Sequence, residues 1–135
     1  MPILLMRRTR MSKHFTYSGD KMLACPCCGD KGMALVFLKK LDKIREEYGK
    51  PMIVSSGYRC PKYNASMSST GYCGPHTTGR AIDICVSRGD GLSLVKIALD
   101  NGITGLGVNQ KGPHNKRIIH LDDLSGNVRP WIWSY

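Results

Sequence analysis

Hydrophobic positions recur at helical spacing in two segments of the chain. In residues 32–48, large apolar side chains lie three or four positions apart, and lysines and glutamates fill most positions between them. The members of this stripe are Phe37, Leu41, Ile44 and Tyr48. Their period predicts an amphipathic helix that ends at Gly49. A second helix is predicted over residues 91–101, with Asp90 as its N-cap and Gly102 after its last turn.

Shorter segments show the alternation or the β-branched content of strands. They are residues 51–56, 80–87, 105–109 and 116–122. In residues 80–87, Ile82 and Ile84 fall on one face and Asp83 falls on the other. The aromatic tail, residues 129–135, is expected to pack back on the body. Helices and strands in this order predict an α+β fold, a small single domain in which helices flank a mainly antiparallel sheet.

The chain has 135 residues, which suits one domain, and its net charge is +10. Such an excess of lysine and arginine attracts polyanions, so nucleic acid, anionic lipid and the acidic bacterial cell wall all remain open as partners. No segment reaches the ~18 apolar residues of a membrane-spanning helix. Residues 1–13 are predicted to form a flexible basic arm without signal-peptide features, and residues 14–135 the folded domain.

The chain contains six cysteines, and three of them lie in residues 25–29, Cys-Pro-Cys-Cys-Gly. Cys25 and Cys28 have the spacing of one half of a tetrahedral zinc site. A second such pair is absent from the sequence, so Cys60 or Cys73 would have to complete the site. Reduced thiols, a second, structural metal at Cys25, Cys28 and Cys60, and a disulfide all remain open.

Ionisable groups interrupt two of the predicted strands. His120 lies in the apolar run 118–122 and shares one face with Asp122. Asp83 is flanked by isoleucines, and burying a lone carboxylate is costly. A metal ion would satisfy these groups together with His76, which opens the segment that leads to Asp83. A simple hydrogen-bonded histidine–aspartate pair is the alternative.

Three motifs follow one another along the chain: Ser-Gly-Tyr-Arg at residues 56–59, His-x-x-Gly-x-Ala-x-Asp at 76–83 and His-x-Asp at 120–122. In this order they resemble the zinc D-Ala-D-Ala carboxypeptidase/endopeptidase family of peptidoglycan hydrolases, in particular its small phage and prophage lysins. The resemblance runs over residues 14–131 and implies the hedgehog/D-Ala-D-Ala peptidase-like fold. It also implies one catalytic Zn2+ with the ligands His76, Asp83 and His120.

The same resemblance implies roles for further residues. Arg59 would stabilise the negative charge that develops during the reaction. Many relatives carry the catalytic carboxylate three residues before the last histidine, where this chain has Arg117. An arginine cannot act as a general base, so Asp122, on the same face as His120, is the candidate base. Asp123 is the weaker candidate because it should point away from that face.

Three residues are candidates for substrate binding, namely His114, Trp131 and Tyr58. His114 follows the Gly-Pro pair at residues 112–113, and a solvated loop histidine is the alternative interpretation. Trp131 and the aromatic residues after it, Trp133 and Tyr135, would either wall the cleft or close the core.

We therefore expect a monomeric zinc metallopeptidase that uses a zinc-activated water to cut peptide bonds in peptidoglycan stem peptides, as an endolysin-like endopeptidase or a D,D-carboxypeptidase. It would be made in the cytoplasm of a host bacterium and reach the wall through a holin or with the virion, and its charge would hold it there. A zinc-containing wall-binding module without hydrolysis is the alternative. A nucleic-acid binder is less favoured, because the densest basic run is confined to residues 7–10.

Overall fold

The computed structural model describes residues 12–135 of the chain. The predicted basic arm therefore lies outside the described residues except for its last two positions. The Ser12 hydroxyl and the backbone N–H groups of Lys13 and His14 all donate hydrogen bonds to the Asp42 carboxylate, at 2.8, 2.7 and 2.8 Å. Residues 12–14 are thus fastened to the helix that carries Asp42.

A five-stranded sheet forms the centre of the described residues. Its strands are β1 (Ile53–Ser56), β2 (Ala81–Cys85), β3 (Gly105–Asn109), β4 (Ile118–Asp122) and β5 (Trp131–Ser134). Their order is β1-β2-β4-β3-β5, and every neighbouring pair is antiparallel except β3 and β5. The predicted α+β fold with a mainly antiparallel sheet is confirmed, and the aromatic tail packs back as the fifth strand.

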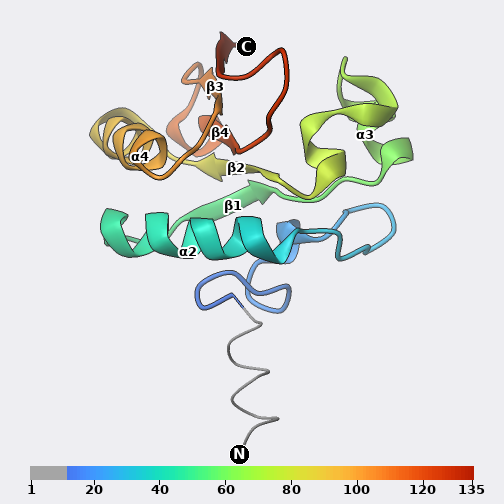
Figure 1. Ribbon diagram of the computed structural model, residues 1–135, viewed down its shortest axis with the longest axis horizontal. Helices are drawn as coiled ribbons and strands as arrows, with labels where there is room; N and C mark the ends of the chain where they lie inside the picture. Colours follow the sequence, from blue (N-terminus) through green and yellow to red (C-terminus); the bar gives the residue numbers. More distant parts are fainter. Residues whose placement is uncertain (1–11) are drawn as a thin grey trace, which may run out of the picture.

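Within residues 12–135, three α-helices and four 3-10 turns pack around this sheet. The helices are α2 (Leu35–Tyr48), α3 (Pro61–Met67) and α4 (Arg88–Asp100), and the turns are η1 (Lys21–Leu23), η2 (Gly71–Cys73), η3 (Pro75–Thr78) and η4 (His114–Lys116). Figure 1 shows α2 below β1 and β2, with α4 and α3 toward opposite ends of the strands. Among the described residues, no helix combines the length and the apolar character that a membrane span requires.

The core lies between the helices α2 and α4 and one face of the sheet. Phe37, Leu41 and Ile44 of the predicted helical stripe are fully buried in it. Ile82 and Ile84 of β2 enter the same core. Because side chains alternate along a strand, this packing turns the residue between the two isoleucines, Asp83, toward the opposite face of the sheet. The core packing thereby decides where a carboxylate emerges.

The ends of the helices follow the sequence only in part. Gly49 ends α2 in the left-handed conformation (φ 76°), as predicted for a C-terminal glycine. Helix α4 begins three residues earlier than expected, and Ser87, not Asp90, is its N-cap residue. The prediction of Asp90 as the cap is therefore wrong. Asp90 lies in the first turn of α4, where its negative charge interacts favourably with the positive end of the helix dipole. Its carboxylate also forms an ion pair with Lys50.

Asp123 joins the end of β4 to α2 and to the segment before β2. Its carboxylate accepts hydrogen bonds from Nε and Nη2 of Arg80, at 2.8 and 2.7 Å, and from Nζ of Lys40 at 3.0 Å. The Asp123 side chain is only 1% exposed. It points away from the face that carries Asp122, as the alternation of β4 predicts.

We expect Asp123→Asn to lower the free energy of unfolding by about 1–3 kcal/mol, because two partly buried cations lose their counter-charge. Urea denaturation measures this change. The matched control is Asp100→Asn, which breaks an exposed i,i+4 pair with Lys96 and should change stability by less than about 0.5 kcal/mol. Equal losses in the two variants would contradict a structural role for the Asp123 cluster.

Candidate metal centre

One row of residues crosses the sheet on the face opposite the core. Asp83 of β2 pairs with His120 of β4, His120 pairs with Gly107 of β3, and Gly107 pairs with Trp133 of β5. Residues that face each other across a ladder project to the same side of the sheet. The register therefore places a carboxylate, an imidazole and an indole side by side, with a glycine between the two rings.

His76 reaches this row from the turn η3, which precedes β2. Its Nδ1 lies 2.7 Å from the Gly57 carbonyl oxygen, and its Nε2 lies 3.2 Å from Oδ1 of Asp83. A carbonyl oxygen can only accept, so Nδ1 carries the hydrogen and donates it. The lone pair of Nε2 therefore faces Asp83.

Asp122 holds His120 through Nε2, whereas His76 is held through Nδ1. Nε2 of His120 lies 2.8 Å from Oδ2 of Asp122, and Nδ1 of the same ring lies 2.9 Å from Oδ1 of Asp83. Asp122 also forms a two-point ion pair with Arg129, through Nε and Nη2 at 2.9 Å each. Burial raises the pKa of Asp122, but the bonds with His120 and Arg129 outweigh it and hold this pKa at about 2. The ionised carboxylate accepts the Nε2 hydrogen, so in the neutral ring the lone pair of Nδ1 faces Asp83.

Asp83 lies between the two imidazoles and is almost fully buried. Burial raises its pKa, yet hydrogen bonds from His120 and then His76, donated when the rings are protonated, bring this pKa well below the usual range. A bound metal would take the place of these protons. Asp83 is therefore ionised, and its Oδ1 contacts one nitrogen of each ring.

The three side chains fit a zinc ion. One ligand atom from each of His76, Asp83 and His120 lies within 4.8 Å of the others. The two nitrogen–oxygen separations, 3.2 and 2.9 Å, are close to the edge of about 3.3 Å expected for a tetrahedron with Zn–N and Zn–O distances near 2.0–2.1 Å. The outward nitrogen of each ring is bound to a carbonyl or a carboxylate, as in zinc sites generally. Three ligands leave one tetrahedral position open, as catalytic zinc sites do.

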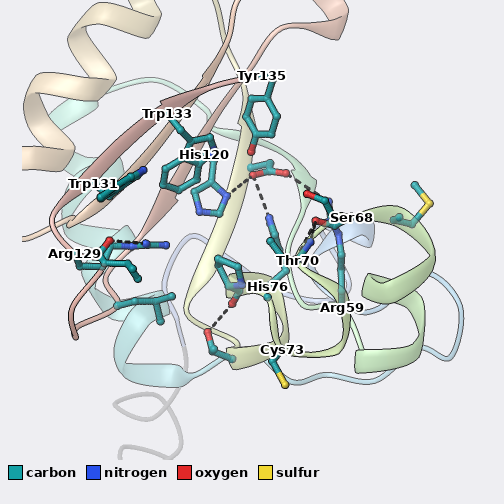
Figure 2. A pocket seen from close by; sticks show the side chains of 18 of the residues that line it. Arg59, Ser68, Thr70, Cys73, His76, His120, Arg129, Trp131, Trp133 and Tyr135 are labelled. Atoms are coloured by element: carbon teal, nitrogen blue, oxygen red, sulfur yellow. Dashed lines mark hydrogen bonds and ion pairs between the residues drawn. The ribbon is translucent and has the colours of Figure 1, made fainter.

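A cleft of about 690 Å³ opens above this cluster. Figure 2 shows Trp131 and Trp133 along one side and Ser68, Thr70 and Arg59 along the other, with Tyr135 at the top and His76 and His120 between the two sides. Burial raises the pKa of the Tyr135 phenol, and the negative charge of Asp83 raises it further. The phenol therefore stays protonated and can donate a hydrogen bond in the cleft.

Arg59 is fixed at the edge of the cluster by polar neighbours. Its Nε donates to Oγ of Ser56 at 3.1 Å and its Nη1 to Oδ1 of Asn64 at 3.3 Å. Its Nη2 lies 3.7 Å from Oδ2 of Asp83. Asn64 is itself buried and donates to Thr70 and to the Gly71 carbonyl. The guanidinium is thus held in place beside the three candidate ligands.

Two of the candidate substrate-binding residues lie elsewhere. His114 is exposed in η4, where its Nδ1 lies 3.0 Å from Oγ of Ser87, and it does not line the cleft. Tyr58 packs against the core, and its ring lies over Gly32. Tyr58 thus faces the core, whereas its neighbour Arg59 lines the cleft. Trp131 does line the cleft.

Sequence reasoning left the tail undecided and missed the glycines of β3. Residues 131, 133 and 135 alternate, which indicates a single aromatic face, and Gly105 and Gly107 alternate in the same way. A Cβ at Gly105 would collide with the Asp122 carboxylate, and one at Gly107 would lie 2.6 Å from Nε1 of Trp133. The Gly-x-Gly pair is a signal for side chains that fold over this strand.

The thiols also gather in part as predicted. Cys25, Cys28 and Cys60 lie together, and Cys27 joins them. Cys73 is not a member of the group, and it lines the cleft instead.

A protein-family model described as Peptidase M15 matches residues 13–122, well over half of the chain. The matched range contains Arg59, His76, Asp83 and His120, whereas β5 follows it. This match agrees with the family indicated by the order of the motifs. No curated protein matches the chain.

We expect Gly105→Ala to lower the affinity of this centre for zinc by about 10–100-fold, because the new methyl group displaces Asp122 from His120. Competition with a chromophoric chelator measures the affinity, and circular dichroism checks the fold. Gly89→Ala is the matched control, because a Cβ there meets nothing within 4 Å. Unchanged zinc affinity in the Gly105 variant would contradict an orienting role for Asp122.

Proposed function

Because the chain belongs to the peptidase M15 family, we propose that it is a zinc metallopeptidase that hydrolyses peptide bonds of bacterial peptidoglycan, as an endolysin-like endopeptidase or a D,D-carboxypeptidase. Family membership implies a peptidase. The observation that carries the proposal of zinc is the convergence of Nε2 of His76, Nδ1 of His120 and the Asp83 carboxylate, with the second nitrogen of each ring already bound.

Zinc bound by these three residues would polarise the scissile carbonyl and lower the pKa of a water molecule. The protein supplies the orientation. The Gly57 carbonyl fixes the His76 ring, and the Asp122 carboxylate fixes the His120 ring and its tautomer. In their neutral forms, both imidazoles thus present their lone pairs to the metal without rotation of the rings.

Arg59 is proposed to stabilise the negative charge that develops on the carbonyl oxygen. Its Nε and Nη1 are engaged with Ser56 and Asn64, so its Nη2 is held toward the cluster. A donor fixed in this way needs no reorganisation as charge develops. The Tyr135 hydroxyl is a second donor in the cleft.

Asp122 is better suited to positioning than to the role of general base expected from the sequence. Its side chain is fully buried, and its oxygens are occupied by His120 and Arg129. A carboxylate with a pKa near 2 is also a weak proton acceptor at neutral pH. We therefore propose that Asp122 orients His120.

One observation favours a second candidate function, a zinc-containing wall-binding module without turnover. Asp83 is the only carboxylate among the described residues that line the cleft. Arg117 stands at the position where many relatives carry the base, and its Nε donates to the Gly112 carbonyl at 2.9 Å. In either function, the +10 charge would favour the anionic wall.

Digestion of purified sacculi separates the two functions. The zinc-loaded protein should release new amino groups or free D-alanine, and a chelator should abolish the release. His120→Ala should lose both the metal of this centre and the activity. The matched control, His114→Ala, removes an exposed histidine outside the cleft and should retain both. Stoichiometric zinc and sacculus binding without any product would refute hydrolysis and support the binding module.

Substitutions of Arg59 and of Asp122 should affect different quantities, the first kcat and the second the affinity for zinc. Arg59→Ala should lower kcat by about 10²–10³-fold with zinc content unchanged, because a transition-state donor is lost. Asp122→Asn should lower zinc affinity by about 10–100-fold, and excess zinc should restore much of the rate. Lys43→Ala, which removes an exposed positive charge from α2, is the control for net charge. If the Asp122→Asn enzyme were inactive even when saturated with zinc, this result would contradict a purely orienting role and support Asp122 as the general base.

A further inference from the structure

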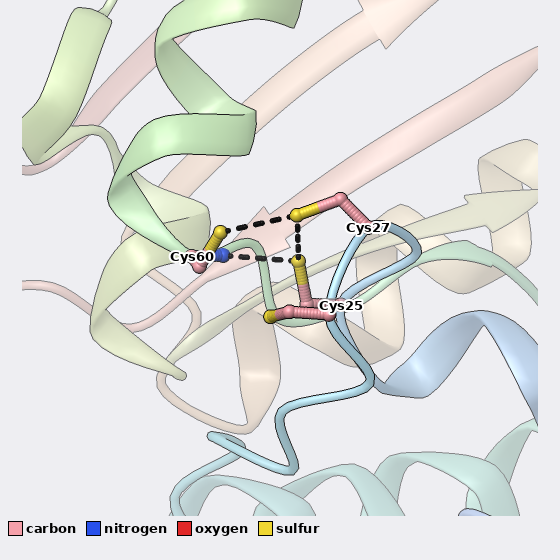
Figure 3. A group of neighbouring side chains, drawn as sticks. Cys25, Cys27 and Cys60 are labelled. Atoms are coloured by element: carbon pink, nitrogen blue, oxygen red, sulfur yellow. Dashed lines mark hydrogen bonds between the residues drawn. The ribbon is translucent and has the colours of Figure 1, made fainter.

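Four thiols gather on the side of the molecule that carries α3. Three come from the loop of residues 25–28 after η1, and the fourth is Cys60, the residue before α3. Figure 3 shows Cys25, Cys27 and Cys60 facing one another. The Sγ atom of Cys27 lies 3.6 Å from that of Cys25 and 3.4 Å from that of Cys60. All four Sγ atoms, including that of Cys28, lie within 4.8 Å of one another.

These separations match metal ligation. Sulfur atoms in a disulfide are about 2.05 Å apart. Four sulfurs around zinc, each about 2.3 Å from the metal, are about 3.8 Å from one another. The separations of 3.6 and 3.4 Å in the structure are close to the second value. A cluster of four thiols at this spacing has the donor number and the donor type of a structural zinc site.

The local backbone is shaped around the sulfur atoms. Gly29 has φ 76°, and its N–H donates to the Cys25 carbonyl at 2.8 Å, so the loop turns back on itself. The Cys60 N–H points at Sγ of Cys25 at 3.3 Å, and the Tyr63 N–H points at Sγ of Cys60 at 3.4 Å. Backbone donors aimed at sulfur favour the thiolate, which is the form that binds metals.

The cluster is accessible to an ion from solvent. Cys25 is buried, whereas Cys27 and Cys28 are exposed and Cys60 is partly exposed. Zinc can therefore reach the exposed thiols from solvent and also bind the buried sulfur of Cys25, and the thiol protons are released to water.

We propose that Cys25, Cys27, Cys28 and Cys60 bind one structural zinc ion, separate from the candidate metal centre. The ion would join the loop that follows η1 to the start of α3. Cys27 is the ligand that the sequence prediction omitted.

This site would hold the segment of residues 57–60, which also serves the candidate metal centre. The N–H groups of Gly57 and Tyr58 donate to the carbonyls of Met22 and Leu23, at 2.9 and 3.0 Å. The Gly57 carbonyl accepts a hydrogen bond from His76. Along the chain, Arg59 lies between Gly57 and Cys60. A metal at the thiols would therefore restrain both the support of one imidazole and the guanidinium. This effect on catalysis rests on the proposed function, whereas the thiolate site does not.

Zinc content measured by mass spectrometry, on protein purified under reducing conditions, tests the site. We expect two zinc ions per chain in the wild type and one in His120→Ala. In that same background, the double variant Cys28→Ser/Cys60→Ser should hold none. Cys85→Ser is the matched control, because Cys85 lies outside the cluster, and it should keep one ion. An ion retained by the double variant would overturn the proposal.

Cobalt substitution gives a readout that removes no cysteine. His120→Ala loaded with Co²⁺ should show intense thiolate-to-cobalt charge-transfer absorption and tetrahedral visible bands. The absence of this absorption, or an intact mass lower by two hydrogens for each disulfide, would overturn the thiolate site. Neither measurement depends on hydrolysis, so a protein without activity on sacculi but with this spectrum would refute the proposed function and keep the second zinc site.

Discussion

The buried carboxylate of Asp83 sets the constraint on which the rest of the structure depends. An ionised group at this depth is costly without partners, and Asp83 receives them from His120, His76 and Arg59 at 2.9, 3.2 and 3.7 Å. The partners come from a strand, a 3-10 turn and a loop, and each has a further contact that fixes it. The cluster is satisfied only as a unit, so these elements must be held together.

The two faces of the sheet carry different side chains, one packing in the hydrophobic core and the other holding the charged cluster. Ile82 and Ile84 enter the core beneath the helices, which forces Asp83 onto the other face and into register with His120. On that face, the absence of side chains at Gly105 and Gly107 leaves room for Asp122 and Trp133. Hydrophobic packing on one side thus fixes the position of the charged groups on the other.

Residues 57–60 connect the two groups of potential metal ligands. Within four positions the chain provides a carbonyl to His76, a guanidinium beside Asp83 and a thiol to the cysteine cluster. The segment has little regular structure of its own, and its backbone is held by Met22 and Leu23. The turn η1, near the start of the described residues, therefore bears on the geometry of a cleft formed by much later strands.

The sequence by itself determined what depends on local pattern. The period of Phe37, Leu41 and Ile44 predicts α2, the alternation around Asp83 predicts β2, and the order of the motifs indicates the family and its candidate ligands. Only the tertiary structure decided which groups meet across long separations. It gave Asp122 a salt bridge to Arg129 and a low pKa, added Cys27 to the thiols, and turned Tyr58 and His114 away from the cleft. Burial and hydrogen-bonding or charged partners determine the pKa of an ionisable side chain, and neither can be predicted from its neighbours in the sequence.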